Sequence, residues 1–270
     1  MTTPEHAPHP DAVAVRVEDV CHYFVRRHGE PLLVADHVSF DVPRGQFVSL
    51  VGPSGCGKTT VLNMIAGLVA PTLGRVVRDG STVTRPRRDV GYMFARDGLL
   101  PWRSAHANVE LGLELRGIPA RERRSRADEL LDVVGLTGFG SSYPGQLSQG
   151  MRQRVALART LSLRPDLLLM DEPFAALDAQ TKLIVQEEFI KVWEGSGMTV
   201  IWVTHDLEEA VALSDRVIVF SARPGRIKSD SWVDLERPRN IEEVRFLPEF
   251  QEVHSRIWSD LRDEVKRAQL

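Results

Sequence analysis

The chain has 270 residues, enough for one large domain or two small ones with a buried core. Hydrophobic residues make up 43% and charged residues 26%, a composition that excludes an intrinsically disordered chain. Lys and Arg total 34 against 37 Asp and Glu, and this net charge of −3 argues against a basic protein that binds nucleic acid.

The cellular compartment is indicated by the cysteines and by the lack of long apolar runs. Cys21 and Cys56 are too few for a disulfide framework and fit a reducing cytosol. No apolar run approaches the roughly 18 residues of a membrane span. Residues 1–11 resemble no signal peptide, and we expect a disordered tail there rather than a histidine-rich metal site. The sequence therefore predicts a cytosolic chain, which can lie against a membrane-bound partner.

The N-terminal third predicts strands followed by a helix. Apolar residues alternate along two early segments, at Val13, Val15 and Val17 and at Val38, Phe40 and Val42. This period of two is typical of strands with one solvated face. Residues 47–51 are almost continuously apolar, and a glycine-rich turn and a helix from Lys58 to about Ala66, ended by Gly67, follow them. A strand buried on both faces before a helix indicates a parallel sheet.

The middle third changes to helical spacing. Residues 105–134 predict helices, with a break at 117–119. Four arginines at 121, 123, 124 and 126 favour a solvated helix start over a nucleic-acid patch. Strands alternate with helices again from 167–170, through 199–203 and 216–220. The pattern therefore predicts an α/β fold with a helical insertion.

A phosphate-binding loop follows the buried strand. The segment fits G-x-x-x-x-G-K-[ST] with Gly52, Pro53, Ser54, Gly55, Cys56, Gly57, Lys58 and Thr59. Glycines let the backbone N–H groups curl around phosphates, and the helix that begins here directs its positive end at the same anion. We expect Lys58 to bind the β- and γ-phosphates, Thr59 to bind Mg²⁺ and Thr60 to join the nucleotide site. Cys56 is interpreted as packing within the loop rather than as a redox group.

Two carboxylates end the apolar strand at 167–170. Asp171 and Glu172 are expected at the carboxyl edge of the sheet, where ligands of open α/β sheets bind. We predict that Asp171 holds Mg²⁺ through water and that Glu172 orients and polarises the attacking water. His205 follows the strand at 199–203 and is expected at the same edge, in contact with the γ-phosphate, rather than serving only as a structural hydrogen-bonding group.

With these elements in this order, the chain resembles the ATPase subunit of an ABC transporter over about residues 13–270. The segment 147–154 resembles the family's signature motif, and 176–178 resembles its D-loop. The resemblance implies a P-loop NTPase (RecA-like) core in an ATPase domain at 12–235. An N-terminal antiparallel β subdomain, a helical insertion at about 95–165 and a C-terminal extension with an amphipathic helix at 236–270 would accompany it.

The same resemblance implies a homodimer that holds two ATP molecules with Mg²⁺ between head-to-tail subunits. Ser148 and Gly150 are expected to face the γ-phosphate held by the other subunit, and Gln149 and Asp178 to belong to the nucleotide-binding residues. A serine and a glycine N–H at a helix start form a second anion site, in agreement with this role. Phe24 is expected to stack on adenine, with Tyr23 as the alternative and burial of the aromatic in its strand as a third possibility.

Three further segments, 99–102, 221–226 and 236–239, resemble the nitrate, sulfonate and taurine import subfamily. This resemblance implies a peripheral subunit at the cytoplasmic face of the membrane, which drives an integral-membrane permease fed by an extracytoplasmic solute-binding protein. Leu99, Leu100 and Trp102 are then expected to contact the permease, or else to pack under their loop. Pro224 and Gly225 predict a type II turn. An apolar stripe at Phe250, Val253, Ile257, Leu261 and Val265 predicts a helix that docks on the body.

Two positions depart from the family pattern. Gln149 stands where the signature motif has glycine, while Ser148 and Gly150 remain. Ala95 stands where the family has a glutamine that bonds Mg²⁺ and the attacking water. We expect water to replace that side chain, or Asp97 to reach inward. Two other functions stay open: an ATP-binding regulatory module with low turnover, and a non-transport ABC ATPase that acts on nucleic acid or ribosomes.

Overall fold

The computed structural model describes residues 13–25 and 29–268; the predicted tail at 1–11 lies outside them. The strands are β1 (Val13–Phe24), β2 (Leu32–Pro43), β3 (Phe47–Val51), β4 (Leu73–Arg78), β5 (Ser81–Thr82), β6 (Val90–Met93), β7 (Leu167–Asp171), β8 (Thr199–Val203), β9 (Arg216–Phe220) and β10 (Ile227–Trp232). The α-helices are α1 (Lys58–Ile65), α2 (Ala105–Leu115), α3 (Ala120–Val133), α4 (Gln149–Leu161), α5 (Ala179–Trp193), α6 (Leu207–Leu213) and α7 (Pro248–Ala268), with short 3₁₀ helices at Pro144–Gln146 and Val244–Phe246.

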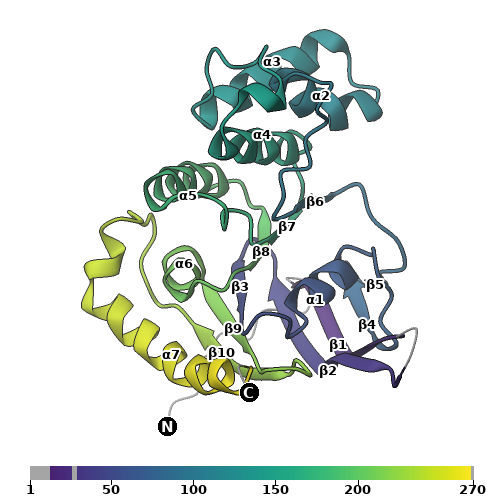
Figure 1. Ribbon diagram of the computed structural model, residues 1–270, viewed down its shortest axis with the longest axis vertical. Helices are drawn as coiled ribbons and strands as arrows, with labels where there is room; N and C mark the ends of the chain where they lie inside the picture. The colour runs from purple at the N-terminus through teal and green to yellow at the C-terminus, as the bar shows by residue number, and fades with distance from the viewer. Residues whose placement is uncertain (1–12, 26–28, 269–270) are drawn as a thin grey trace.

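A six-stranded sheet forms the centre of the molecule, in the order β10-β9-β3-β8-β7-β6 (Figure 1). All neighbours pair in parallel except β10, which runs antiparallel to β9 at the edge. Every residue of β3 and β8 is buried, because helices cover both faces of the sheet. The predicted α/β fold is confirmed, and the carboxyl ends of β3, β8, β7 and β6 meet at one edge.

The N-terminal sheet is antiparallel, in the order β2-β1-β4-β5. The alternating residues predicted to face inward are buried, among them Val15, Val17, Val38 and Val42. They form one hydrophobic cluster with α1 and with one face of the central sheet. Helix α1, which begins at the phosphate loop, is therefore enclosed between the two sheets (Figure 1).

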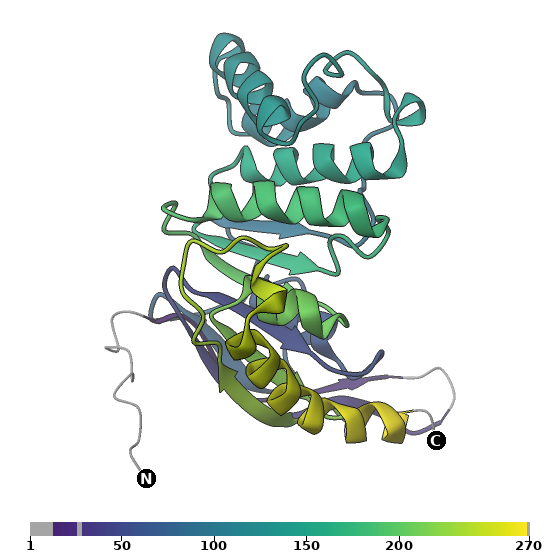
Figure 2. The same ribbon diagram turned by 90° about the vertical axis from the view of Figure 1, so that its left-hand side faces the viewer.

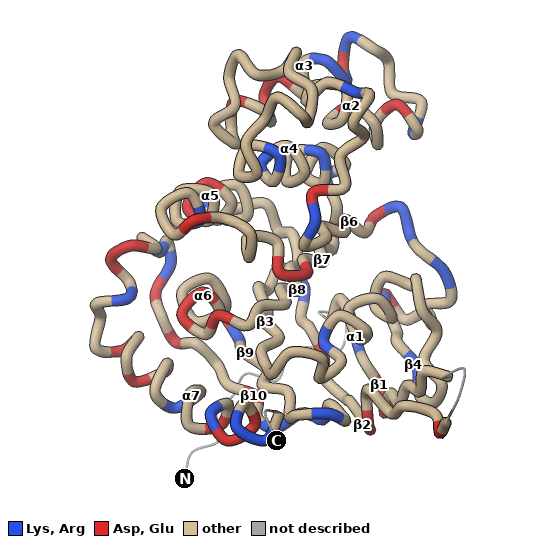
Figure 3. Tube along the Cα trace, in the orientation of Figure 1, with Lys and Arg blue, Asp and Glu red and all other residues tan. Residues whose placement is uncertain are grey.

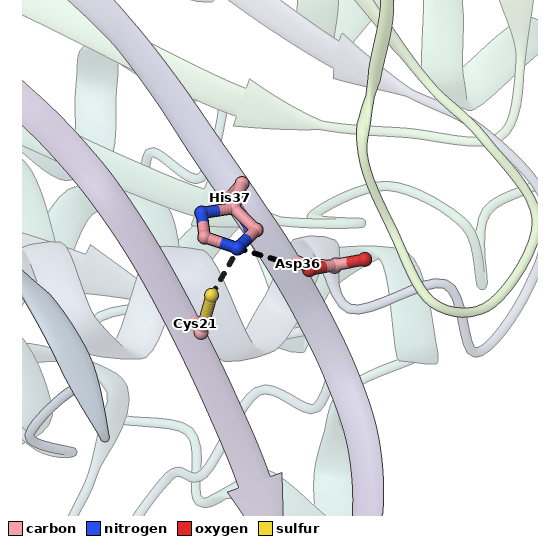
Figure 4. Close-up of side chains that lie close together, drawn as sticks. All are labelled: Cys21, Asp36 and His37. Carbon is pink, nitrogen blue, oxygen red and sulfur yellow. Dashed lines mark hydrogen bonds and ion pairs between the residues drawn. The ribbon is translucent and has the colours of Figure 1, made fainter.

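Cys21 on β1 lies close to Asp36 and His37 on β2, where the pairing of the two strands is irregular (Figure 4). The backbone N–H of His37 donates to Cys21 Sγ at 3.2 Å, and its ring Nδ1 lies 2.7 Å from Asp19 Oδ1. The hydrogen bond and the charge of Asp19 raise the pKa of His37. Asp36 accepts a hydrogen bond from Arg226 Nε at 2.7 Å. Each carboxylate therefore has a hydrogen-bonded partner within the protein, and the Arg226–Asp36 pair ties the β9–β10 connection to β2.

The helical insertion lies at the opposite end of the molecule from the N-terminal sheet (Figures 1 and 2). Its helices α2 and α3 separate at Gly117, where φ is 75°, as the sequence predicts. Basic and acidic residues are mixed along α3, and Arg121 and Arg124 are exposed (Figure 3). This mixture agrees with a solvated helix. Within residues 13–25 and 29–268, none of the helices combines the length and apolar character needed to cross a membrane.

Helix α7 packs its predicted apolar stripe against α6, β9 and β10. Phe250, Val253, Ile257 and Leu261 are buried, and Val265 is partly buried against the same core. The helix continues as far as Ala268 along the side of the molecule (Figure 2). The docked helix that the sequence predicts is thus present.

The connection at 221–226 corrects one sequence prediction. It joins two strands, β9 and β10, but Gly225 lacks the positive φ that a type II turn requires, so that turn type is wrong. Glycine is needed here for close packing, because a Cβ at this position would lie 2.0 Å from the Cys56 carbonyl oxygen. The Gly225 N–H also donates to the Val34 carbonyl at 2.9 Å. The connection therefore rests directly on the phosphate loop.

Candidate nucleotide-binding site

The phosphate loop connects β3 to α1 with three glycines in conformations that other residues rarely adopt. The φ angles are 156° at Gly52, 73° at Gly55 and 104° at Gly57. A Cβ on Gly57 would also lie 2.8 Å from the Val34 carbonyl oxygen. Lys58 is only 5% exposed, and its Nζ donates to the carbonyls of Gly52 at 2.7 Å and Pro53 at 2.9 Å. The ammonium group is thus held over the centre of the loop.

A cavity opens in front of this loop. Its lining comes from the loop, β1, β2, the end of β7 and the β9–β10 connection: Phe24, Leu32, Val34, Ser54, Gly55, Gly57, Lys58, Thr59, Thr60, Glu172 and Arg223. Phe24 is 44% exposed and borders the cavity, whereas Tyr23 is not part of the lining. Of the two aromatics that the sequence leaves open for adenine, the geometry favours Phe24. Cys56 is buried, as expected of a packing residue.

The oxygen ligands predicted for a metal lie against each other. Thr59 Oγ1 donates to Asp171 Oδ1 at 2.9 Å, so the end of β7 faces the start of α1. Burial raises the pKa of Asp171, and the nearby charge of Glu172 acts in the same direction, while the Thr59 bond and Lys58 oppose it. A hydroxyl and a carboxylate are oxygen donors of the kind that Mg²⁺ takes. These two residues therefore fit the metal that the sequence predicts.

Glu172 and His205 meet at the same edge. His205 Nδ1 lies 3.4 Å from Glu172 Oε2, and the two residues follow the paired strands β7 and β8. Glu172 has a φ of 47°, a left-handed conformation that costs of order 1 kcal/mol, and its N–H donates to the Val203 carbonyl at 2.9 Å. Glu172 lines the cavity, and His205, which is not part of the lining, lies beside its carboxylate.

Ser148 of the signature segment and Asp178 of the D-loop segment are at the N-termini of two other helices. Ser148 caps α4 by accepting from the Met151 N–H at 3.2 Å, and Asp178 caps α5 by accepting from the Thr181 N–H at 3.0 Å. The hydrogen bond from the Thr181 backbone lowers the pKa of Asp178. A Cβ on Gly150 would lie 3.1 Å from Thr181 Cγ2, so the two caps pack closely.

This second group does not reach the first within one chain. Ser148 and Gln149 are exposed, and neither they nor Gly150 and Asp178 belong to the lining of the phosphate-loop cavity. The sequence predictions thus divide into two clusters on different elements. One surrounds the phosphate loop and the other presents two helix N-termini.

The loop after β6 places Asp97 differently from the sequence expectation. Its carboxylate accepts from Arg152 Nε at 3.1 Å and from the Leu99 N–H at 3.1 Å, and its carbonyl accepts from Arg159 Nη2 at 2.6 Å. Asp97 therefore faces α4 rather than the metal ligands, and the suggestion that it reaches inward is wrong. Ala95, two residues earlier, is exposed.

Two roles were considered for the apolar residues of this loop, packing under it and contact with the permease, and Leu99 and Trp102 differ in which of them they fit. Leu99 is 8% exposed and belongs to the main hydrophobic core, as packing under the loop predicts. Trp102 is 70% exposed, as a partner contact predicts. An indole that large and exposed is available for contact with another protein.

Three cavity residues, Leu32, Val34 and Arg223, were missed by the sequence reasoning, and Arg223 is the charged one. Arg223 Nε donates to the Gly55 carbonyl at 3.0 Å, and the side chain lines the cavity. In the sequence, the segment 221–226 was noted for its resemblance to the import subfamily and not as part of the nucleotide site. The contact joins residues 168 apart in sequence, so spacing alone offered no signal for it.

Comparisons with known proteins agree with this geometry. The family model described as ABC transporter matches residues 35–175. The chain is 48% identical over 95% of its length to an uncharacterized ABC transporter ATP-binding protein of Methanocaldococcus jannaschii, covering 94% of that protein. It is 42% identical to the taurine import ATP-binding protein of Rhizobium johnstonii and to the nitrate import ATP-binding protein of a Synechocystis species. These matches cover 90% and 92% of this chain, and 94% and 95% of those proteins.

A solved structure shows the same fold. It is a dimeric ATP-binding cassette in a post-hydrolysis state with ADP and Pi, which superimposes with a TM-score of 0.74 at 33% identity. The match covers 82% of this chain and 100% of that one. The chain therefore belongs to the ABC transporter family as an ATP-binding, ATP-hydrolysing subunit that resembles those of taurine and nitrate import.

Proposed function

We propose that this chain energises a membrane permease that imports nitrate, a sulfonate, taurine or a related small solute. The import relatives at 42% identity over nearly the whole chain support this class of cargo. In this proposal the subunit lies peripherally at the cytoplasmic face of the membrane, and an extracytoplasmic solute-binding protein delivers the solute to the permease. Trp102, exposed beside the helical insertion, is the proposed permease contact.

The observation that carries the proposal is the meeting of β3, β7 and β8 at one edge. Lys58 is proposed to bind the β- and γ-phosphates, and the loop N–H groups to surround them. Thr59 directly and Asp171 through water would hold Mg²⁺, which neutralises phosphate charge when bound. Phe24 would stack on adenine, at the half-exposed position where it borders the cavity.

Glu172 is proposed to accept a hydrogen bond from the attacking water and to align it with the γ-phosphate. Its neighbour His205 would donate to a γ-phosphate oxygen, and the 3.4 Å approach of the two side chains supports a shared role at one reacting group. The remaining donors would come from a second copy, through Ser148 and Gly150 at the start of α4. We therefore propose a head-to-tail homodimer that encloses two ATP molecules.

A Glu172→Gln variant tests this mechanism. It should bind ATP as the parent does, because the phosphate loop is unchanged, but phosphate release should fall by at least about a hundredfold since water alignment is lost. ATP binding and phosphate release are measured on the same purified protein with Mg²⁺. Glu187→Gln, a change of the same kind on α5, is the control and should leave both values unaltered. Phosphate release at the parent rate in Glu172→Gln would remove Glu172 from this role.

The alternative of a regulatory module with low turnover is supported by one observation, Ala95 in place of glutamine. Under that alternative ATP binding would persist while the parent chain releases little phosphate. The phosphate-release measurement on the parent therefore separates the two functions directly.

A further inference from the structure

The β9–β10 connection is built onto the phosphate loop and onto the neighbouring strand β2. Gly225 allows the backbone to approach the Cys56 carbonyl, and its N–H donates to the Val34 carbonyl at 2.9 Å. Arg226, next in the chain, pairs with Asp36 on β2. These contacts fix the position of the connection relative to the cavity, so a side chain that it carries there has a defined place.

Arg223 is that side chain. Its Nε donates to the Gly55 carbonyl at 3.0 Å, and it lines the same cavity as Phe24, Lys58 and Thr60. A guanidinium has five N–H donors, of which this bond uses one. Across residues 13–25 and 29–268, no carboxylate forms an ion pair with it. Arg223 is exposed and lines the cavity, whose other cationic lining residue is Lys58, so its remaining donors are available to a ligand there.

We propose that Arg223 binds the phosphate chain of the nucleotide directly, as a second cation of the site. This inference rests on the proposed ATP-binding function and adds a residue to it. Arginine suits the role because its planar fork makes two parallel hydrogen bonds to phosphate oxygens, whereas lysine provides a single point charge. Phe24 and Arg223 would then hold the base and the phosphates from the side opposite α1.

Helix α7 positions this arginine through Glu264. The Glu264 side chain is 2% exposed, and Oε2 accepts from the N–H of Ala222, the residue before Arg223, at 2.9 Å. Arg267 Nη1 at 3.0 Å and Lys228 Nζ at 3.7 Å balance its charge. A buried carboxylate that has partners on three sides holds the backbone firmly. The C-terminal helix thereby becomes a support of the nucleotide site.

Binding of ATP, ADP and adenosine to Arg223→Ala tests the direct contact. ATP and ADP should each bind about tenfold more weakly, because charge-assisted hydrogen bonds to phosphate are lost, while adenosine affinity stays within about twofold. Arg223→Lys should fall between the parent and Arg223→Ala. Arg124→Ala, which removes an exposed arginine from α3, controls for net charge and should bind all three ligands as the parent does.

Two results would overturn the direct contact. One is an ATP affinity of Arg223→Ala within about twofold of the parent; the other is an equal loss for adenosine, which indicates a disturbed loop rather than a phosphate contact. Lys58→Ala separates this inference from the proposed function. If the parent fails to bind ATP, the proposed function is wrong. If the parent binds ATP, Lys58→Ala does not, and Arg223→Ala binds ATP as the parent does, only the role of Arg223 is rejected.

The positioning role of Glu264 is tested in a double-mutant cycle. Glu264→Gln should weaken ATP binding about threefold in the parent, because the bond to the Ala222 N–H loses its charge. In the Arg223→Ala background the same change should have no further effect on ATP affinity. An equal loss in both backgrounds would show that Glu264 acts on the site by some route other than Arg223, and would contradict this role.

Discussion

Ala95 stands where the family has a glutamine, which raises the question of whether hydrolysis depends on that one side chain. It is exposed at the end of β6, and Asp97, the nearest carboxylate in sequence, is held by Arg152 and Arg159. Neither residue offers an oxygen in place of the glutamine amide. Since Mg²⁺ commonly retains several waters when it is bound, a water at that position would supply the missing oxygen.

Ala95→Gln should therefore change the rate of ATP hydrolysis by less than about tenfold, or ~1.4 kcal/mol of barrier. The reason is that the added amide replaces a water ligand without creating a new charge. Hydrolysis by both proteins is measured with the permease in one membrane preparation. An inactive parent that the glutamine activates would contradict this expectation and support the regulatory-module function.

Some residues of the site could be predicted from the sequence and others could not. Lys58, Thr59, Asp171 and Glu172 were predictable because each follows a strong local pattern, a glycine loop or a buried strand that ends in acids. Asp97 was not, because its orientation is decided by Arg152, 55 positions away in sequence. Long-range side-chain partners leave no trace in local spacing.

In the loop after β6, Leu99 is packed in the core and Trp102, three positions later, is exposed. Leu99 belongs to the core shared with the helical insertion, while Asp97 joins the loop to α4 through Arg152. We expect α4 and this loop to move together, because the Asp97–Arg152 ion pair and the buried Leu99 both hold the loop against the helical insertion. We expect the loop to transmit contact at Trp102 through its backbone and its packing.

Trp102→Ala should weaken co-purification with the cognate permease while ATP binding remains at the parent level. The indole is 70% exposed, so its removal takes away contact area for a partner without opening a core cavity. Leu99→Ala is the matched comparison and should lower the free energy of unfolding by about 2–4 kcal/mol, because it leaves a cavity. Denaturant unfolding of both variants checks this. A Trp102→Ala protein that unfolds as readily as Leu99→Ala would identify the indole as a core residue.

At the level of elements, strands and helices with clear periodicity were predicted well and their connections less so. The continuous apolar run of β3 and the apolar stripe of α7 both predicted correctly which residues are buried, because the spacing of apolar residues follows directly from burial. The turn at Gly225 was mispredicted, since its geometry follows from contact with Cys56 in a distant loop. Packing between connections, rather than the dipeptide Pro-Gly, determines that conformation.

The whole molecule presents two half-sites that a single chain keeps apart. The phosphate loop and Glu172 line one cavity, with Asp171 against Thr59 and His205 against Glu172, while Ser148, Gly150 and Asp178 lie at the N-termini of α4 and α5. A head-to-tail pair of chains would bring each cavity against the helix N-termini of the other copy. The central claim of this account is that ATP is hydrolysed only in such a composite site.

Mixing two inactive variants tests this claim most directly. Lys58→Ala disables the phosphate loop, and Ser148→Arg disables the helix N-terminus that faces it. In a mixed dimer one site carries both defects and the other carries neither. An equal mixture should therefore regain about a quarter of the parent phosphate release, because half of the dimers have one intact site of two. Phosphate release that stays at the level of either variant alone, while a tagged chain captures the other, would contradict the composite site.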